Sequence, residues 1–203
     1  MTTTTTSPYV LSDEALDVLF REARTANTFT DEPVSVEEIR AVHDLVRFGP
    51  TAMNNQPLRL VLVQSPDARA RLVEHMGGNN KAKTSTAPLV AILAADDDFH
   101  ERLPEHFPHA PGVRDVLRDD PEGRAKQAEF NAALQIGYFL LGVRAAGLAA
   151  GPMAGFDHAG VDREFLAGTS WRSLLVVNIG HPGPDAWQDR LPRMSFDDAV
   201  TVV

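Results

Sequence analysis

The sequence predicts a single domain of the α+β or α/β class. Amphipathic helical patterns alternate along the chain with short, β-branched, apolar stretches that are typical of buried strands. The length of 203 residues is that of one ordinary domain, and neither an internal repeat nor a linker divides the chain. Hydrophobic residues make up 43% and charged residues 23%, so the chain has enough apolar side chains to form a core.

Two helices are expected at the start of the domain. Ser12 is a candidate N-cap for a helix over residues 13–23, which has apolar side chains at helical spacing. Ser35 and Glu38 have the spacing of a capping box, and the apolar stripe that follows them predicts a second helix. Gly49, followed by proline, ends that helix.

Two buried strands with a helix between them are expected next. Residues 60–63 are short, apolar and partly β-branched, and residues 88–95 form a longer run of the same kind. Pro66 suits the first turn of the intervening helix, and the two glycines and two asparagines of residues 77–80 indicate a turn.

The second half of the chain contains an excursion and a long helix. Residues 96–121 are rich in proline, glycine and charge, which favours an irregular or partly helical lid. Residues 122–146 predict a helix that Gly147 ends; its second half is apolar nearly all round, interrupted only by Gln135 and Arg144. Such a helix needs burial on every side, which a dimer interface would supply.

The last third predicts a turn, a short helix and a third strand. Residues 151–156 are expected to form a glycine-rich turn, and Asp157 to cap a short helix. Residues 174–179 are the third strand, and residues 180–192 an extended crossing segment. Residues 1–11, with five consecutive threonines, are expected to be a disordered tail before a domain of residues 12–203.

Composition excludes several classes of protein. A net charge of −9 argues against a general nucleic-acid or acidic-membrane binder, although it permits a local basic pocket. The absence of cysteine excludes disulfides, thiol nucleophiles and cysteine-ligated metals. No run of about 18 apolar residues predicts a spanning helix, and the N-terminus lacks the pattern of a secretory signal, so we expect a cytoplasmic protein.

Common catalytic motifs are also missing. The chain has no G-x-G-x-x-G, P-loop, G-x-S-x-G or H-E-x-x-H pattern. His100, His106 and His109 lie close together in sequence but lack a well-spaced carboxylate, so we interpret them as exposed or lid histidines and expect no metal site. The three aspartates of residues 96–98 resemble a divalent-ion cluster, but a solvated strand end is the preferred interpretation.

Polar segments without a role in the helix or strand patterns are the candidates for function. Consecutive carboxamides at residues 54–56 suit the edge of a heterocycle with alternating carbonyl and N–H groups. Arginines near both ends of the chain suit a phosphate, and the glycines of residues 151–155 permit close approach of a flat ligand. Together these segments predict a mononucleotide site, which flavin mononucleotide (FMN) would fit.

The order and spacing of these segments resemble the nitroreductase family of FMN-dependent oxidoreductases. The matching elements are Arg24-Thr25, the loop at residues 50–57, Asn80 with Lys83, the turn at residues 151–157, and Arg193. Five ordered matches cover nearly the whole chain from residue 12 to residue 203. The resemblance implies an α+β fold with a central mixed or antiparallel sheet flanked by helices and the long apolar helix at an intertwined homodimer interface.

The resemblance also implies a mechanism and a set of site residues. Hydride would pass from NADPH or NADH to flavin N5 and then, in ping-pong fashion, to a second substrate, with Lys83 stabilising the reduced flavin. No residue is identified as a catalytic acid or base. The residues that the resemblance assigns to cofactor binding are Arg24, Thr25, Asn27, Pro50, Thr51, Ala52, Met53, Asn54, Gln56, Asn80, Lys83, Pro152, Met153, Ala154, Gly155, Arg190 and Arg193.

A narrower resemblance concerns the malonic semialdehyde reductases of this family. The peptides at residues 24–27, 99–109, 151–157 and 190–196 are similar to those of that branch. The implied reaction is reduction of malonic semialdehyde, or a similar small aldehyde, to 3-hydroxypropionate. Candidates for contact with the substrate, or for the lid, are Phe99, Arg102, His106, Phe107 and His109.

Departures from the broad family leave other functions open. Asn27, Leu58 and Ala154 replace residues common among nitroreductases, which weakens a plain nitroaromatic assignment without weakening flavin binding. The alternatives are a broad-range FMN nitro or quinone reductase, a flavin-binding protein without turnover, and a flavin-free structural domain with a helical dimer core.

Overall fold

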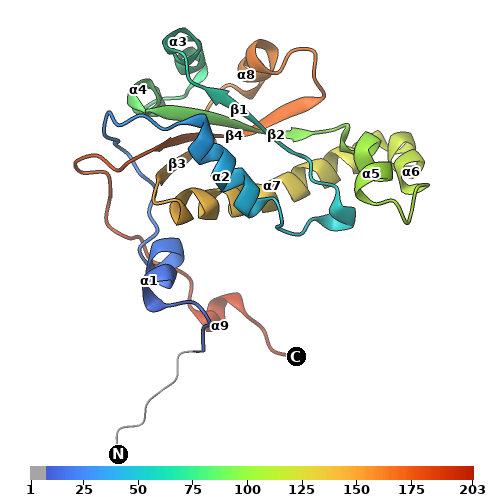
Figure 1. Ribbon diagram of the computed structural model, residues 1–203, viewed down its shortest axis with the longest axis horizontal. Coiled ribbons are helices and arrows are strands. Elements are labelled where there is room, and N and C mark those ends of the chain that lie inside the picture. Colours follow the sequence, from blue (N-terminus) through green and yellow to red (C-terminus); the bar gives the residue numbers. More distant parts are fainter. Residues whose placement is uncertain (1–7) are drawn as a thin grey trace, which may run out of the picture.

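A four-stranded antiparallel sheet forms the centre of the fold (Figure 1). The computed structural model describes residues 8–203. The sheet order is β1-β2-β4-β3, and all eight residues of β2 are buried, as befits a central strand covered on both faces. Antiparallel pairing throughout makes the class α+β, as expected. The strands are β1 (Leu58–Val63), β2 (Leu89–Asp96), β3 (Ala149–Met153) and β4 (Trp171–Gly180).

Helices cover both faces of the sheet. Helices α2 and α7 lie on one face, and α3, α4 and α8 lie on the other (Figure 1). The α-helices are α1 (Asp13–Leu16), α2 (Val36–Val46), α3 (Pro66–His75), α4 (Asn80–Thr86), α5 (Leu103–His106), α6 (Val113–Asp119), α7 (Pro121–Ala145), α8 (His158–Phe165) and α9 (Phe196–Ala199). Shorter helical turns are η1 (Asp17–Arg21), η2 (Ala52–Asn54) and η3 (Phe99–Arg102).

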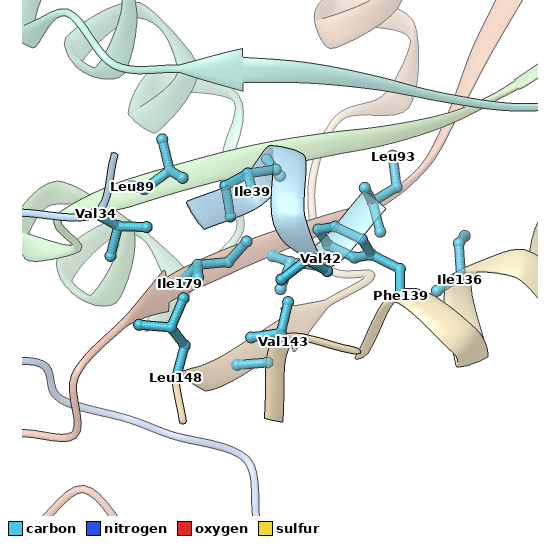
Figure 2. Packing of buried hydrophobic residues seen from close by; sticks show 13 residues of the cluster. Val34, Ile39, Val42, Leu89, Leu93, Ile136, Phe139, Val143, Leu148 and Ile179 are labelled. Carbon is cyan, nitrogen blue, oxygen red and sulfur yellow. The ribbon is translucent and has the colours of Figure 1, made fainter. Parts of the chain in front are cut away.

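The main hydrophobic core lies between the sheet and the pair α2 and α7. Figure 2 shows Ile39 and Val42 of α2 facing Phe139 and Val143 of α7, with Ile179 of β4 beside them. These side chains are almost completely buried. The apolar stripes in the sequence therefore face the core, as the helical periodicity predicts.

The long helix α7 matches its predicted bounds to within one residue at each end. Asp120 caps its start by accepting from the N–H of Gly123, and Gly147 ends it with a φ of +77°. One face packs on the core, but Phe130 and Leu134 on the opposite face remain exposed, so a single chain does not bury the helix on every side. No helix within residues 8–203 has both the length and the apolar character needed to cross a membrane.

The predicted glycine-rich turn at residues 151–156 is wrong in its first half. Residues Ala149–Met153 form β3, which pairs with β4 along one side only. The segment has no β-branched residue, and Pro152 disfavours a central strand, so the local sequence does not indicate this strand. An edge position tolerates the proline, and the pairing with β4 supplies the order that the local sequence lacks. The turn itself is confined to residues 154–157.

The N-terminal part differs from expectation in two ways. The predicted helix over residues 13–23 is a single α-helical turn, α1, followed by the π-helical turn η1, and Phe20 on its apolar stripe remains half exposed. Most of the predicted disordered tail, residues 1–7, lies outside the described residues, whereas residues 8–11 are exposed and carry neither helix nor strand.

The segment at residues 24–30 lies beside the segment at residues 181–190. Figure 1 shows the segment after α1 running beside the C-terminal segment below the sheet. The N–H of Asn27 donates to the carbonyl of Ala186 at 3.0 Å, and Phe29 forms a β-bridge with Pro182. Arginines from the two ends of the sequence are thereby brought together.

The capping box of α2 offers a test of local stability. The N–H of Glu38 donates to Ser35 Oγ, while the N–H and hydroxyl of Ser35 donate to the Glu38 carboxylate; these last bonds lower the pKa of Glu38. Ser35→Ala should destabilise the fold by about 1 kcal/mol at neutral pH. Part of this deficit should vanish as pH falls through the lowered pKa, because protonated Glu38 no longer attracts the hydroxyl donor.

Urea unfolding of the wild type and Ser35→Ala, at neutral pH and at successively lower pH, measures this effect. Glu37→Gln is the matched control, because Glu37 is exposed in the same first turn. A Ser35→Ala deficit that stays constant across this range would contradict the role of the Glu38 carboxylate.

Candidate functional site

Three arginines from opposite ends of the chain line one cavity. Arg24, Arg190 and Arg193 surround a space of about 310 Å³ together with Thr25 and Asn27. Arg190 donates to the carbonyls of Arg21 and Ala23, which fixes it against the N-terminal segment. The cavity wall also contains Asp189, and Glu22 forms an exposed ion pair with Arg24 at 3.4 Å. Guanidinium groups in this number suit a phosphate dianion.

The segment at residues 24–27 is held against the edge strand β3. The N–H of Ala26 donates to the carbonyl of Ala150 at 3.0 Å, and Ala26 is buried. A Cβ added at Gly151 would lie 2.7 Å from the Ala26 carbonyl oxygen, so only glycine permits this approach. Pro152 lines an adjoining cavity, while Met153 points into the core on the α3 and α8 side.

Helix α4 brings Lys83 and Asn80 to the same region. Lys83 Nζ donates to Asn27 Oδ1 at 2.7 Å, and Asn80 Nδ2 donates to the carbonyl of Gly155 at 3.1 Å. The N–H groups of Ala154 and Gly155 have no hydrogen-bond partner among the described residues. The structure therefore unites Arg24, Thr25, Asn27, Asn80, Lys83, Pro152, Ala154, Gly155, Arg190 and Arg193 into one group, which we call the phosphate-side group.

The loop at residues 50–57 forms a separate group. Met53, Asn54 and Gln56 have positive φ angles of 52°, 51° and 44°, which is uncommon for residues other than glycine. Gln56 Nε2 donates to Asn54 Oδ1 at 3.0 Å, and the N–H of Gln56 to Thr51 Oγ1 at 3.3 Å. The carboxamides are therefore held on a defined backbone rather than on an open turn.

Helix α7 supplies two supports for this loop that sequence reasoning missed. Buried Asn131 accepts from the N–H of Ala52 at 2.8 Å, and Gln135 accepts from the N–H of Leu58 at 2.9 Å. Tyr138 adds a longer contact, 3.4 Å, to the carbonyl of Pro50. The sequence shows Gln135 as a polar residue that interrupts an apolar helix, but it does not indicate that Leu58 is its partner.

The excursion at residues 96–121 lies against this loop. Asn54 Nδ2 donates to the carbonyl of His106 at 3.0 Å, and Met53 packs on the core of the excursion. Arg102 is exposed and pairs loosely with Glu105 at 3.7 Å. Four of the lid candidates have exposed or half-exposed side chains, namely Arg102, His106, Phe107 and His109. The rings of Phe107 and His109 lie with their centroids 3.9 Å apart.

Phe99 and His100 are interior residues of the excursion. Phe99 is 1% exposed and packs with Leu103, which places it beneath the surface rather than on it. His100 was expected to be an exposed or lid histidine. It lies in the excursion but is buried beside Arg124, and this burial, with the nearby guanidinium, lowers its pKa. Within residues 8–203, no set of three or more His, Asp or Glu side chains is arranged to hold a metal ion.

The aspartates that end β2 are bound by arginines. Asp96 pairs with Arg59 at 2.7 Å and accepts from the hydroxyl of Ser170, and Asp97 pairs with Arg172 at 2.7 Å. The expectation of a solvated strand end is therefore wrong for Asp96, which is 8% exposed. These carboxylates anchor the strand ends to their neighbours. Asp96 is also tied to the loop at residues 50–57, because its partner Arg59 donates to the carbonyl of Gln56 at 2.9 Å.

Comparison with known proteins gives the family. The Nitroreductase family pattern matches residues 20–181. A protein of Streptomyces griseus, named "Putative NADH dehydrogenase/NAD(P)H nitroreductase", is 59% identical over 194 residues, which cover 96% of this chain and 98% of that protein. A protein of the same name from Leptothrix cholodnii is 48% identical over 195 residues, covering 96% and 99% of the two chains.

Solved structures share the fold at lower sequence identity. A nitroreductase family protein from Streptococcus pneumoniae superposes with a TM-score of 0.79 and 21% identity, covering 91% of this chain and 98% of that chain. A structure from Exiguobacterium sibiricum, described as a "putative nitroreductase in complex with FMN", also gives a TM-score of 0.79, with 17% identity and coverage of 97% and 100%. The chain that places these arginines, carboxamides and lysine around one antiparallel sheet belongs to the nitroreductase family.

Proposed function

We propose that this chain is an FMN-dependent NAD(P)H oxidoreductase. The observation that carries the proposal is the convergence of Arg24, Arg190 and Arg193 on one cavity beside the Lys83–Asn27 pair. In a protein with a net charge of −9, this local positive charge is suited to an anionic ligand. Family membership, and the FMN in the Exiguobacterium sibiricum structure, support FMN as that ligand.

The residues present fit FMN chemically. The three arginines would hold the phosphate, and Lys83 would place a positive charge near the pyrimidine side of the ring system. The unpartnered N–H groups of Ala154 and Gly155 would meet ring heteroatoms. When bound, FMN supplies the chemistry of accepting a hydride from NAD(P)H and giving it to a second substrate.

The proposed active form is a homodimer. The phosphate-side group and the loop at residues 50–57 share no hydrogen bond or ion pair within residues 8–203. Asn131 supports the loop, and Arg144 lines a cavity with Arg24 and Arg193 of the phosphate-side group. These two residues are thirteen residues apart on α7, about 20 Å along its axis. In a two-fold dimer that pairs the exposed faces of α7, the phosphate-side group of each chain would lie against the loop at residues 50–57 of the second chain.

Exposed apolar side chains support this pairing. Phe130 and Leu134 of α7, with Leu45 and Phe48 at the end of α2, remain between 39% and 80% exposed. Sedimentation equilibrium should give twice the chain mass, and a monomer that binds FMN tightly would overturn the shared-site arrangement.

The proposed substrate is malonic semialdehyde or a similar small carboxylated aldehyde. Its reduction consumes NAD(P)H and a proton and yields 3-hydroxypropionate and NAD(P)⁺. The support is the Asn54–His106 contact, which places the excursion, with its exposed Arg102, beside the carboxamide loop. An arginine in that position would recognise a substrate carboxylate.

Arg102→Ala should raise KM for malonic semialdehyde about tenfold, because the substrate loses a charge-assisted partner. A neutral aldehyde of similar length should show less than a twofold change. Arg114→Ala serves as the control on the same excursion, since Arg114 already pairs with Asp115 at 2.9 Å. Equal effects of Arg102→Ala on both aldehydes would remove Arg102 from substrate recognition.

A broad-range nitro or quinone reductase is the second candidate. It is favoured by the names of the relatives that are 59% and 48% identical. A non-catalytic FMN-binding protein is the alternative of another class, and it would bind FMN without being reduced by NAD(P)H.

Anaerobic stopped-flow mixing separates these functions. FMN-loaded protein is mixed with NADPH or NADH, and then with malonic semialdehyde, a nitroaromatic or a quinone. Loss of flavin absorbance that the aldehyde restores supports the proposed reaction. Restoration by a nitroaromatic or quinone alone favours the second candidate, and no bleaching by either nicotinamide favours the binding protein. A protein that takes up no FMN overturns the proposal as a whole.

A further inference from the structure

A fourth arginine lies beside the phosphate-side group. Arg144, near the end of α7, lines a cavity of about 240 Å³ that adjoins the one described above and shares Arg24, Thr25 and Arg193 with it. No sequence motif indicates this role. Arg144 was visible only as the second interruption of the apolar half of α7.

The orientation of Arg144 is fixed by a backbone contact. Its Nε donates to the carbonyl of Val18 at 2.7 Å, across the boundary between α7 and η1. Neither terminal nitrogen of the guanidinium has a hydrogen-bond or ion-pair partner among residues 8–203. A half-buried guanidinium that is held by one nitrogen therefore keeps its other two nitrogens available for a ligand in a cavity that it lines.

Within residues 8–203, no carboxylate forms an ion pair with Arg144. Arg144 also lines a larger cavity of about 550 Å³ whose wall includes Glu14, Asp17 and Glu22. Asp17 pairs with Arg21 and Glu22 with Arg24, and none of the three carboxylates pairs with Arg144. Burial lowers the pKa of Arg144, and the positive charges of Arg190 and Arg24 lower it further. Like charges in this arrangement favour an anion between them.

We infer that Arg144 is a fourth anion-binding residue, which contacts the phosphate of the cofactor together with Arg24, Arg190 and Arg193. This inference rests on the proposed binding of FMN. Riboflavin lacks the phosphate, so a contact between Arg144 and the phosphate would strengthen binding of FMN and not of riboflavin.

The test compares FMN with riboflavin in the wild type, Arg144→Gln and Arg144→Lys. Glutamine keeps an N–H donor for the Val18 carbonyl but removes the charge, whereas lysine keeps the charge. Dissociation constants are measured by titration of flavin fluorescence on the full-length apoprotein at low and high salt. Arg163→Gln is the matched control, because Arg163 is an exposed arginine on α8, away from the cavity.

Arg144→Gln should weaken FMN binding about tenfold and riboflavin binding less than twofold, with partial recovery in Arg144→Lys. The loss should shrink at high salt, since screening weakens the wild-type interaction. Inorganic phosphate should raise the melting temperature of the wild-type apoprotein more than that of Arg144→Gln.

Two results would overturn the inference while leaving the proposed function intact. One is an equal loss for FMN and riboflavin, which would mean that Arg144 only joins α7 to η1. The other is unchanged FMN binding in a folded Arg144→Gln. A wild-type protein that binds FMN no more tightly than riboflavin would instead overturn the assignment of the whole arginine cavity.

Discussion

Replacing Lys83 by methionine should slow the reduction of bound FMN by NAD(P)H about 100-fold. Lys83 is held by Asn27 Oδ1 at 2.7 Å and is the one lysine of the phosphate-side group. Reduction adds negative charge to the flavin ring system, and a fixed ammonium group stabilises that charge more than it stabilises the oxidised form. The effect should therefore appear in the reduction rate at saturating FMN, measured by anaerobic stopped flow.

Lys81 provides the control for this substitution. It lies two residues earlier on the same helix, α4, but points to an exposed ion pair with Glu74 at 3.6 Å. Lys81→Met should leave the reduction rate unchanged, and Lys83→Arg should recover part of it. Wild-type reduction kinetics in Lys83→Met with FMN fully bound would show that this charge does not act on the flavin.

Gly151→Ala should lower FMN affinity at least tenfold and also lower the melting temperature of the apoprotein. The new Cβ would lie 2.7 Å from the carbonyl oxygen of Ala26, and no side-chain rotation can relieve a contact with backbone. The segment at residues 24–27 must then move away from β3, and it carries both Arg24 and Asn27. A displacement of this kind typically costs about 1–3 kcal/mol in stability.

The matched control is Gly112→Ala. Gly112 is exposed, has a φ of −68°, and a Cβ there would meet nothing within 4 Å. Thermal unfolding and FMN titration of both variants should show an effect only at Gly151. If Gly151→Ala bound FMN as the wild type does, the contact between residues 24–27 and β3 would not position the phosphate-side group.

Local interactions explain which elements the sequence predicts well. The capping box of α2, Asp120 and Gly147 at the ends of α7, and the cap at Asp157 all act within a few residues of their partners. Strand β3 depends instead on pairing with β4, which is distant in sequence. Helix α4 has no apolar stripe, and its one buried residue, Thr84, gives no periodic signal.

The same distinction applies to the candidate site. Ordered motifs indicated the residues of the phosphate-side group, but only the fold brings the two chain ends together through Asn27 and Ala186. Asn131 and Gln135 support the carboxamide loop from more than 70 residues away, with sequence separations of 79 and 77. Side chains that act on a distant backbone group carry no local pattern, so the sequence alone does not identify them.

The backbone of the loop at residues 50–57 has a consequence for ligand affinity. Met53, Asn54 and Gln56 have left-handed backbone conformations, each of which lowers the folding stability by about 1 kcal/mol or more. Hydrogen bonds to Asn131, Gln135 and the His106 carbonyl hold this part of the chain in place. The fold therefore bears this conformational cost before any ligand arrives. A flavin or substrate that contacts the loop does not have to order it, so little of the binding free energy is lost to restricting backbone entropy.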